Sequence, residues 1–153
     1  IRDRNGTVGC VVLDKQGNLT AGTSTGGMFK KRWGRIGDSP VIGAGTYADN
    51  NSCAVSCTGH GEYFIRHAVA FDVCARYKYL KESVEKAADY IIHTELNTNA
   101  GNGGLIAVDK LGNIAMPYNS GGMFRGFLYK EKGSPEIKKG CGIGKKIVVV
   151  GEK

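Results

Sequence analysis

Gly6 and Thr7 are the first residues whose types and order could support catalysis. A threonine hydroxyl is a poor nucleophile unless a base takes its proton, and the α-amino group of an N-terminal threonine, with a pKa of ~7.7, can be that base. Cleavage after Gly6 would create such a terminus. The bond is suited to self-cleavage, because a glycine has no side chain to keep the Thr7 hydroxyl from its carbonyl, which an N-to-O acyl shift requires. Gly-Thr-Val is also a common start of a β-strand. Taken alone, that structural interpretation is the better one.

The elements that would position Thr7 begin with a repeat. Residues 11–29 (VVLDKQGNLTAGTSTGGMF) return about 95 positions later as residues 106–124 (IAVDKLGNIAMPYNSGGMF). Each copy predicts two strands joined by a tight turn, because Gly and Asn tolerate the positive φ that hairpin turns require. We therefore expect two similar hairpins, although chance similarity between generic hairpins is an alternative.

Residues 40–58 predict two further strands, PVIGAGTYA and CAVSCT, separated by the turn-forming run 49–52. Residues 62–80 are apolar on most faces, as in a helix packed between layers. A second, amphipathic helix is expected to begin at a Ser83 N-cap. Strands, two helices and strands in this order indicate an α+β layer structure. After Tyr129 the pattern is lost, apart from a short apolar run at 147–150 that is a candidate last strand.

Composition excludes several function classes. The net charge is +7, but seven lysines and three glutamates are concentrated from residue 130 onward without interleaved aromatic residues, so we expect a solvated basic tail and no nucleic-acid partner. No apolar run is long enough to cross a membrane. The five cysteines are an odd number without a C-x-x-C pair, and the three histidines lack ligand spacing, so we expect a reducing, cytoplasmic location and no metal. Cys53 and Cys57 are expected to share a buried strand face.

Five motifs in register add a resemblance to a known family. They are Gly6–Gly9 (GTVG), Thr23–Met28 (TSTGGM), Gly34–Pro40 (GRIGDSP), Gly43–Ala48 (GAGTYA) and Thr58–Glu62 (TGHGE). In this order and spacing they resemble the β subunit of plant-type L-asparaginases and isoaspartyl aminopeptidases, which are N-terminal nucleophile hydrolases. The resemblance extends from Gly6 to about Phe124. It implies a four-layer αββα sandwich in which this chain supplies the β-subunit half.

The resemblance also implies roles for individual residues. Thr7 would be the catalytic nucleophile after cleavage between Gly6 and Thr7, and Thr25 would hydrogen-bond to its hydroxyl. Arg35 would hold the α-carboxylate of the substrate and Asp38 its α-ammonium, since a guanidinium and a carboxylate close together match both groups. Without the resemblance, these two residues would be better read as a surface ion pair.

An oxyanion site is implied at the end of the strand that precedes the first helix. Backbone N–H groups at such a position can receive developing negative charge. By the resemblance, the Thr58 hydroxyl and the Gly59 N–H would form the oxyanion hole, and Gly61 would contact the substrate. His60 is interpreted as a neighbour and not as a catalytic base.

The expected function is hydrolysis of isoaspartyl dipeptides and L-asparagine through a β-aspartyl-threonine ester, without a cofactor. The alternatives are a glycosylasparaginase-type amidase and a non-enzymatic or unprocessed relative acting as a binding protein. We expect residues 1–6 to end a linker, 7–129 to form the catalytic β subunit and 130–153 to form a basic C-terminal segment. Because Ile1 is not Met, the sequence is expected to start inside a longer precursor. The resemblance implies an upstream α subunit from that precursor and an (αβ)2 assembly acting on a small-molecule substrate.

Overall fold

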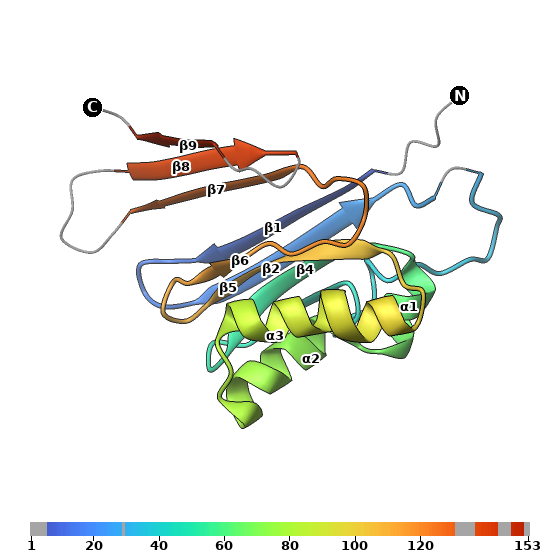
Figure 1. Cartoon of the computed structure of the whole chain (residues 1–153), viewed down its shortest axis with the longest axis horizontal. Helices are drawn as coiled ribbons and strands as arrows, with labels where there is room; N and C mark the ends of the chain where they lie inside the picture. The colour runs from blue at the N-terminus through green and yellow to red at the C-terminus, as the bar shows by residue number, and fades with distance from the viewer. Residues whose placement is uncertain (1–5, 29, 131–136, 144–147, 152–153) are drawn as a thin grey trace. The chain divides into compact units, whose positions relative to one another are not determined.

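The computed structural model of the 153-residue chain describes residues 6–28, 30–130, 137–143 and 148–151 (Figure 1). Its contacts divide the chain into two units, Ile1–Asn119 and Ser120–Lys153. Unit 1 combines helices with antiparallel sheets, and the described part of unit 2 contains three antiparallel strands. The fold is therefore mixed α and β, with unit 1 carrying all the residues predicted to form the site.

The first hairpin pairs β1 (Thr7–Leu13) with β2 (Leu19–Thr25) in antiparallel register. Burial alternates along both strands, as the two-residue side-chain period of a strand requires. Val11 on the inward face packs with a small apolar cluster, whereas Val8 and Val12 on the outward face are 68% and 47% exposed. The hairpin thus has one packed face and one exposed face, on which Val8 and Val12 are large apolar residues.

A carboxylate closes each of the two repeated hairpin turns. Asp14 accepts hydrogen bonds from the Asn18 backbone N–H at 2.7 Å and from the Asn18 side chain at 2.8 Å. Asp109 makes the same two bonds with Asn113, at 2.9 and 2.8 Å. The glycine before each asparagine has a φ of 89°, which glycine adopts without strain. The repeat predicted from the sequence is confirmed as a repeated hairpin turn.

The second sheet of unit 1 has the antiparallel order β3-β4-β5-β6. Its strands are β3 (Thr46–Ala48), β4 (Cys53–Gly59), β5 (Gly103–Asp109) and β6 (Ile114–Ala115). β4 lies at its centre and is buried on both faces over most of its length.

The strand predicted across residues 40–48 is wrong for most of that range. Only Thr46–Ala48 is extended, and residues 38–45 form a compact loop instead. Within this loop the Asp38 carbonyl oxygen accepts hydrogen bonds from Val41 N at 2.9 Å and Gly45 N at 3.1 Å. These local bonds replace a sheet ladder and fix Asp38 beside the end of β4.

The helical region is divided more finely than predicted. The expected helix over 62–80 is interrupted at Ala68, which is left-handed with φ 45° and ψ 47°. Its parts are α1 (Gly61–Arg66), α2 (Val69–Ala75) and the π-helical turn η1 (Arg76–Leu80). The next helix comprises α3 (Val84–Tyr90) and η2 (Ile91–Leu96). Ser83 accepts a hydrogen bond from Lys86 N at 3.2 Å, so the predicted N-cap is confirmed.

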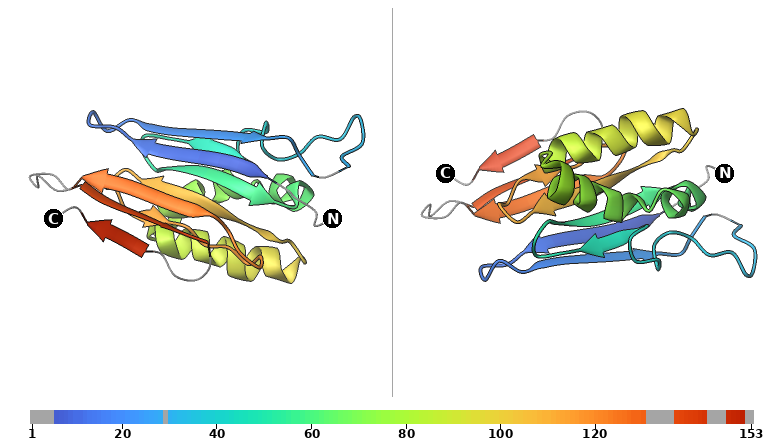
Figure 2. Two further views of the ribbon diagram at one scale, coloured as in Figure 1. Left: turned by 90° about the horizontal axis from the view of Figure 1, so that it is seen from above. Right: turned by 90° about the horizontal axis from the view of Figure 1, so that it is seen from below.

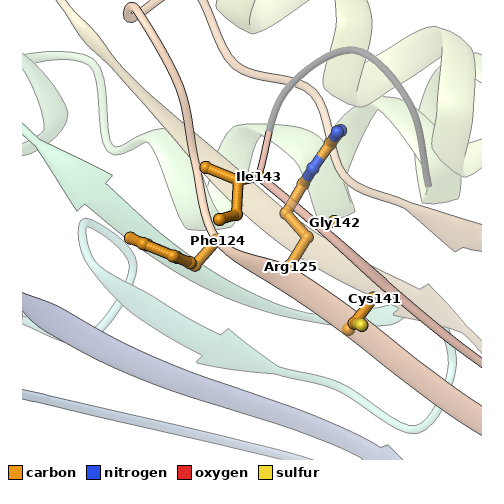
Figure 3. A pocket seen from close by; sticks show the side chains of 6 residues that line it. Phe124, Arg125, Cys141, Gly142 and Ile143 are labelled. Carbon is orange, nitrogen blue, oxygen red and sulfur yellow. The ribbon is translucent and has the colours of Figure 1, made fainter. Parts of the chain in front are cut away.

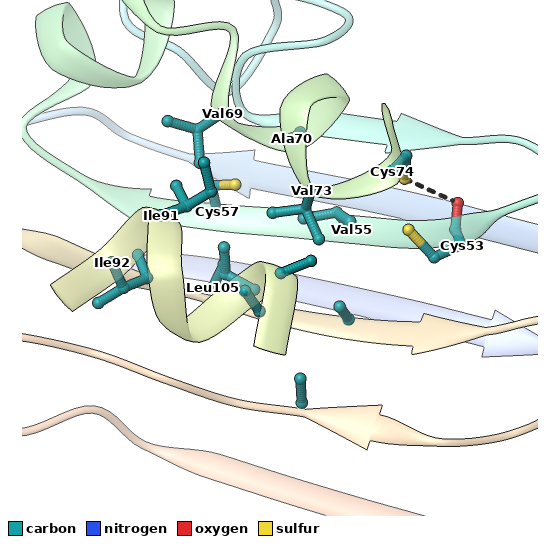
Figure 4. Packing of buried hydrophobic residues seen from close by; sticks show 14 of the residues in the cluster. Cys53, Val55, Cys57, Val69, Ala70, Val73, Cys74, Ile91, Ile92 and Leu105 are labelled. Carbon is teal, nitrogen blue, oxygen red and sulfur yellow. Dashed lines mark hydrogen bonds between the residues drawn. The ribbon is translucent and has the colours of Figure 1, made fainter. Parts of the chain in front are cut away.

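Unit 1 is layered, with the β1–β2 hairpin on one face of the second sheet and the helices on the other (Figures 1 and 2). The helical face of β4 presents Cys53, Val55 and Cys57 to a core that includes Val73 and Leu105 (Figure 4). The predicted burial of both cysteines on one strand face is confirmed. The opposite face of β4 packs Ala54 in the cluster under the hairpin.

Unit 2 has the strand order β7-β8-β9. Its strands are β7 (Arg125–Lys130), β8 (Ile137–Gly142) and β9 (Val148–Gly151). The candidate strand at 147–150 therefore corresponds to β9, although residue 147 lies outside the described residues. β8 had no signal in the sequence pattern.

Candidate active site

Thr7 and Thr25 face each other across the open end of the first hairpin, where the register pairs them directly. The Thr7 hydroxyl donates to Thr25 Oγ1 at 3.2 Å, and the Thr25 hydroxyl donates to the Gly6 carbonyl oxygen at 3.0 Å. Thr25 Oγ1 also accepts from Gly27 N at 3.0 Å. A hydroxyl has one donor and two acceptor sites, so these three bonds fix the Thr25 proton on the Gly6 carbonyl. One side chain thus connects the predicted nucleophile with the predicted cleavage site.

The end of β4 lies at the same end of unit 1 as this pair. A side chain at Gly9 of β1 would overlap Ser56 of β4, so the two strands touch at that level. At the other end of the hairpin, Leu19 N donates to Asn50 Oδ1 at 2.7 Å, before β4 begins. The chain from Asn50 to Ser56 therefore runs alongside the hairpin, from the end at Leu19 to the level of Gly9. Thr58 lies further along in the same direction, toward Thr7. Figure 1 shows the start of β1 and the end of β4 on the same side.

The backbone geometry at Gly59 follows from the strand pairing. His60 N donates to Asn102 O at 2.9 Å, so the position opposite Asn102 is a hydrogen-bonded one in the extension of the β4–β5 ladder. Hydrogen-bonded and non-bonded pairs alternate along an antiparallel ladder, which makes Gly59–Gly103 a non-bonded pair. Its N–H is directed away from β5, to the side on which Cys57 N donates to the Gly45 carbonyl at 2.9 Å. This orientation suits the predicted oxyanion donor.

Glycine is required at position 59 for two reasons. Its φ is 153°, and a Cβ there would overlap the Asn102 carbonyl oxygen and lie 2.8 Å from Gly103 Cα. The ends of β4 and β5 therefore touch backbone to backbone at the predicted oxyanion turn. Thr58 is half-buried immediately before it.

Asp38 is the buried acid of the site and is only 6% exposed. Its Oδ2 has no hydrogen-bond partner in the described structure. Burial raises the pKa of the Asp38 carboxyl above 3.8, opposed by backbone N–H groups of Asp38 and Ser39 and by the Arg35 charge, while Glu62 adds to the rise. A buried, unpaired carboxylate oxygen is suited to a cation.

Gly61, the first residue of α1, lies close to this acid. A Cβ at Gly61 would lie 2.9 Å from both Asp38 N and Asp38 Oδ1. Gly45 makes a second link, because its carbonyl accepts from Thr23 Oγ1 of β2 at 3.1 Å and its N–H donates to the Asp38 carbonyl. The hairpin, the 38–45 loop and the start of α1 are thereby joined around Asp38.

Arg35 makes its ion pair with Glu62, and the prediction did not include this acid as a site residue. Arg35 Nη2 lies 2.9 Å from Glu62 Oε2, with the two side chains 31% and 57% exposed. Arg35 still acts on Asp38 through its charge, which lowers the pKa of that carboxyl. One signal in the sequence could have indicated Glu62 as a site residue. Glu62 directly follows Gly61, which was itself predicted to contact the substrate.

The structure thus brings Thr7 against Thr25 and Asp38 against Gly61. The predicted roles of the site residues stay predictions for Thr7, Thr25, Thr58, Gly59, Arg35, Asp38 and Gly61. An open hollow of about 570 Å³ occurs elsewhere, in unit 2 (Figure 3). It is lined by Phe124, Arg125, Gly126, Cys141, Gly142 and Ile143, none of which was predicted to act in the site.

Within the described ranges, no group of three or more potential metal-ligating side chains occurs. In the same ranges, no helix combines the length and apolar character needed to cross a membrane.

Comparison with known proteins identifies the relatives of this arrangement. The chain is 48% identical over 142 residues to an isoaspartyl peptidase of Escherichia coli (strain K12), covering 86% of this chain and 44% of the relative. It is 54% identical over 124 residues to an isoaspartyl peptidase of Salmonella typhimurium, covering 81% and 40%. It is 53% identical over 120 residues to a probable isoaspartyl peptidase/L-asparaginase 2 of Arabidopsis thaliana, covering 78% and 36%.

The chain spans less than half the length of each of these relatives. The family model described as asparaginase matches residues 1–137. This match includes both repeated hairpins, the 38–45 loop and the end of β4. The chain therefore belongs to the asparaginase family.

Proposed function

We propose that this chain is the nucleophile-bearing part of a hydrolase that acts on isoaspartyl dipeptides and L-asparagine, with Thr7 as the attacking group. The observation that carries the proposal is the hydrogen-bonded set in which Thr25 joins the Thr7 hydroxyl to the Gly6 carbonyl. The relatives named isoaspartyl peptidase support the substrate class. No cofactor is needed for the steps below.

Self-cleavage comes first in the proposed sequence of steps. The Thr7 hydroxyl oxygen attacks the Gly6 carbonyl carbon, the C–N bond breaks, and the acyl group moves from nitrogen to oxygen while the hydroxyl proton is transferred to the departing nitrogen. Water then hydrolyses the ester and leaves Thr7 with a free amino group. The Thr25 hydroxyl, which donates to the Gly6 oxygen at 3.0 Å, stabilises the negative charge that forms on that oxygen.

Substrate hydrolysis uses the new terminus. The Thr7 α-amine accepts the hydroxyl proton while the oxygen attacks the side-chain carbonyl of the aspartyl group. Negative charge on the carbonyl oxygen is received by the Thr58 hydroxyl and the Gly59 N–H, which the ladder alternation directs away from β5. The leaving amine takes the proton, and water hydrolyses the β-aspartyl-threonine ester to release aspartate.

Substrate selection is assigned to Asp38 and Arg35. The α-ammonium of the substrate would pair with the buried Asp38 oxygen that has no described hydrogen-bond partner, and would lower the pKa that burial raises. Arg35 would bind the α-carboxylate with guanidinium nitrogens other than the Nη2 that faces Glu62. Only the side-chain carbonyl is then left to meet Thr7.

An upstream α half of the same precursor is proposed to complete the enzyme. Val8 and Val12 give the outward face of the hairpin an exposed apolar character, and the relatives are more than twice as long as the aligned region. Covering this face would turn the layers of unit 1 into the four-layer αββα sandwich, and two such pairs would form an (αβ)2 assembly. The five free thiols support a reducing compartment such as the cytoplasm.

The test uses the protein expressed with its upstream half. Intact mass should show a chain that begins at Thr7, and the processed protein should hydrolyse β-Asp-Leu. A glycosylasparagine substrate, tested in parallel, should be turned over far more slowly. Absence of hydrolysis of β-Asp-Leu and asparagine by a fully processed protein would refute the proposal.

A further inference from the structure

We propose that Asn119 is a positioning residue for the oxyanion turn Thr58–Gly59. This inference rests on the proposed function, since it concerns the same turn. Asn119 lies in the segment that follows β6 and has no predicted role in catalysis. Its side chain is held from both ends of the amide, and the segment it binds is the one against which the turn packs.

The Asn119 side chain makes four hydrogen bonds. Its Oδ1 accepts from Gly103 N at 2.8 Å, and its Nδ2 donates to Gly101 O at 2.9 Å. Nδ2 also lies 3.0 Å from Asn97 Oδ1 and 3.2 Å from Ile92 O, so two hydrogens serve three acceptors. The Asn119 backbone N–H adds a bond to Gly103 O at 2.9 Å. The Asn119 side chain therefore binds the segment 101–103 at its first and last residues, through Gly101 O and Gly103 N.

Residues 101–103 lie directly against the oxyanion turn. The Asn102 carbonyl accepts from His60 N at 2.9 Å. A Cβ on Gly103 would overlap the Thr58 carbonyl oxygen, and a Cβ on Gly59 would overlap the Asn102 carbonyl oxygen. The two backbones meet at these glycines, and the ring of the buried Phe64 lies against both of them. A displacement of residues 101–103 in this packed contact is therefore passed to Thr58 and Gly59.

The consequence concerns transition-state binding more than substrate binding. The direction of the Gly59 N–H depends on the last pairs of the β4–β5 ladder, and Asn119 fixes the β5 side of those pairs. In the part of the chain that the structure describes, the hydrogen bonds and ion pair of Arg35 and Asp38, which would bind the ground-state substrate, do not involve Asn119. Loss of the Asn119 amide should therefore lower kcat and leave KM nearly unchanged.

The test compares Asn119→Ala with Asn113→Ala in the processed enzyme that includes its upstream half. Asn113 belongs to the same β5–β6 hairpin, but its side chain bonds to Asp109 at the turn, about 20 Å along β5 from Gly103. With β-Asp-Leu as substrate, Asn119→Ala should lower kcat about 10- to 100-fold, as small misplacements of reacting groups do. KM should change less than about threefold, and Asn113→Ala should keep the wild-type kcat.

A second readout does not depend on catalysis. The His60 amide should exchange its hydrogen faster in Asn119→Ala than in wild type or Asn113→Ala, because its acceptor Asn102 is no longer held. Should Asn119→Ala fail to fold, Asn119→Asp gives the same comparisons, since it keeps the shape but places a carboxylate against the Gly101 and Ile92 carbonyls.

Equal kcat values for the position-119 variant and Asn113→Ala, or unchanged His60 exchange, would overturn the inference. An inactive wild-type enzyme would refute the proposed function instead, while the exchange comparison would still test the positioning role.

Discussion

Replacing Thr25 by valine should leave the precursor folded but slow its self-cleavage. Valine has nearly the shape of threonine but lacks the hydroxyl that donates to Gly6 O at 3.0 Å. Loss of one donor to a developing oxyanion slows a reaction by about 10²–10³, or ~2.7–4 kcal/mol. Because the bond already exists before reaction, where a neutral hydrogen bond contributes ~1 kcal/mol, only the difference of ~2–3 kcal/mol affects the barrier. We therefore expect cleavage about 30- to 160-fold slower.

The assay follows the uncut precursor with time on denaturing gels and by intact mass. Thr25→Ser keeps the hydroxyl and should cleave within a few-fold of the wild-type rate. Thr23→Val is the matched control on the same strand, because its hydroxyl bonds to Gly45 O and Ser56 and does not reach Gly6. Wild-type cleavage in Thr25→Val, or equal slowing in Thr23→Val, would refute the assigned role of the Thr25 hydroxyl.

Further predictions concern the nucleophile and the charged groups. Thr7→Ala should leave the precursor uncut, and terminal sequencing that finds a new end at position 7 would show that cleavage does not need this hydroxyl. Arg35→Ala should raise KM for asparagine by more than tenfold, since a truncated charge pair costs ~2–5 kcal/mol, with precursor cleavage nearly unchanged; steady-state kinetics that match wild type would remove Arg35 from the site. Glu62→Gln should lower KM up to about fivefold, because the exposed carboxylate competes for Arg35 and such pairs contribute ~0.2–1 kcal/mol; a raised KM would mean that Glu62 aids binding. Asp38→Asn should abolish turnover yet raise the free energy of unfolding near neutral pH by ~0.5–2 kcal/mol. Burial raises the pKa of Asp38 above 3.8, so the folded state binds this proton more tightly than the unfolded state does. The stability of the wild type therefore falls as pH rises from 3.8 through the raised pKa, and the stability advantage of Asp38→Asn should vanish below pH 3.8. Thermal unfolding of both proteins at several pH values measures this advantage.

Local signals in the sequence predicted the parts of the fold that depend on local chemistry. The two hairpin turns follow from an aspartate and a Gly-Asn pair at fixed spacing, and the Ser83 cap follows from a hydroxyl before an amphipathic run. The break at Ala68 could not be predicted, because alanine favours helix and only packing places it in the left-handed region. Pro40–Gly45 is apolar enough for a strand, but the carbonyl of Asp38 provides competing local hydrogen bonds.

The candidate site shows a similar division. The resemblance to a known family indicated Thr7, Thr25 and Asp38, and the register and burial of these residues suit the roles assigned to them. The pairing of Arg35 with Glu62 joins residues 27 positions apart, and it depends on how the loop after β2 meets α1. The positioning role proposed for Asn119 likewise depends on hydrogen bonds to Gly101 and Gly103, which are distant in sequence, so the local sequence did not indicate it.

The nucleophile is tested most directly by mass spectrometry of the processed enzyme, quenched with acid during turnover of β-Asp-Leu and digested to peptides. We expect one added aspartyl group on the peptide that begins at Thr7, and no such adduct when Thr7 is replaced by alanine. An aspartyl adduct on any other residue, or continued turnover by protein in which the Gly6–Thr7 bond is intact, would contradict this expectation.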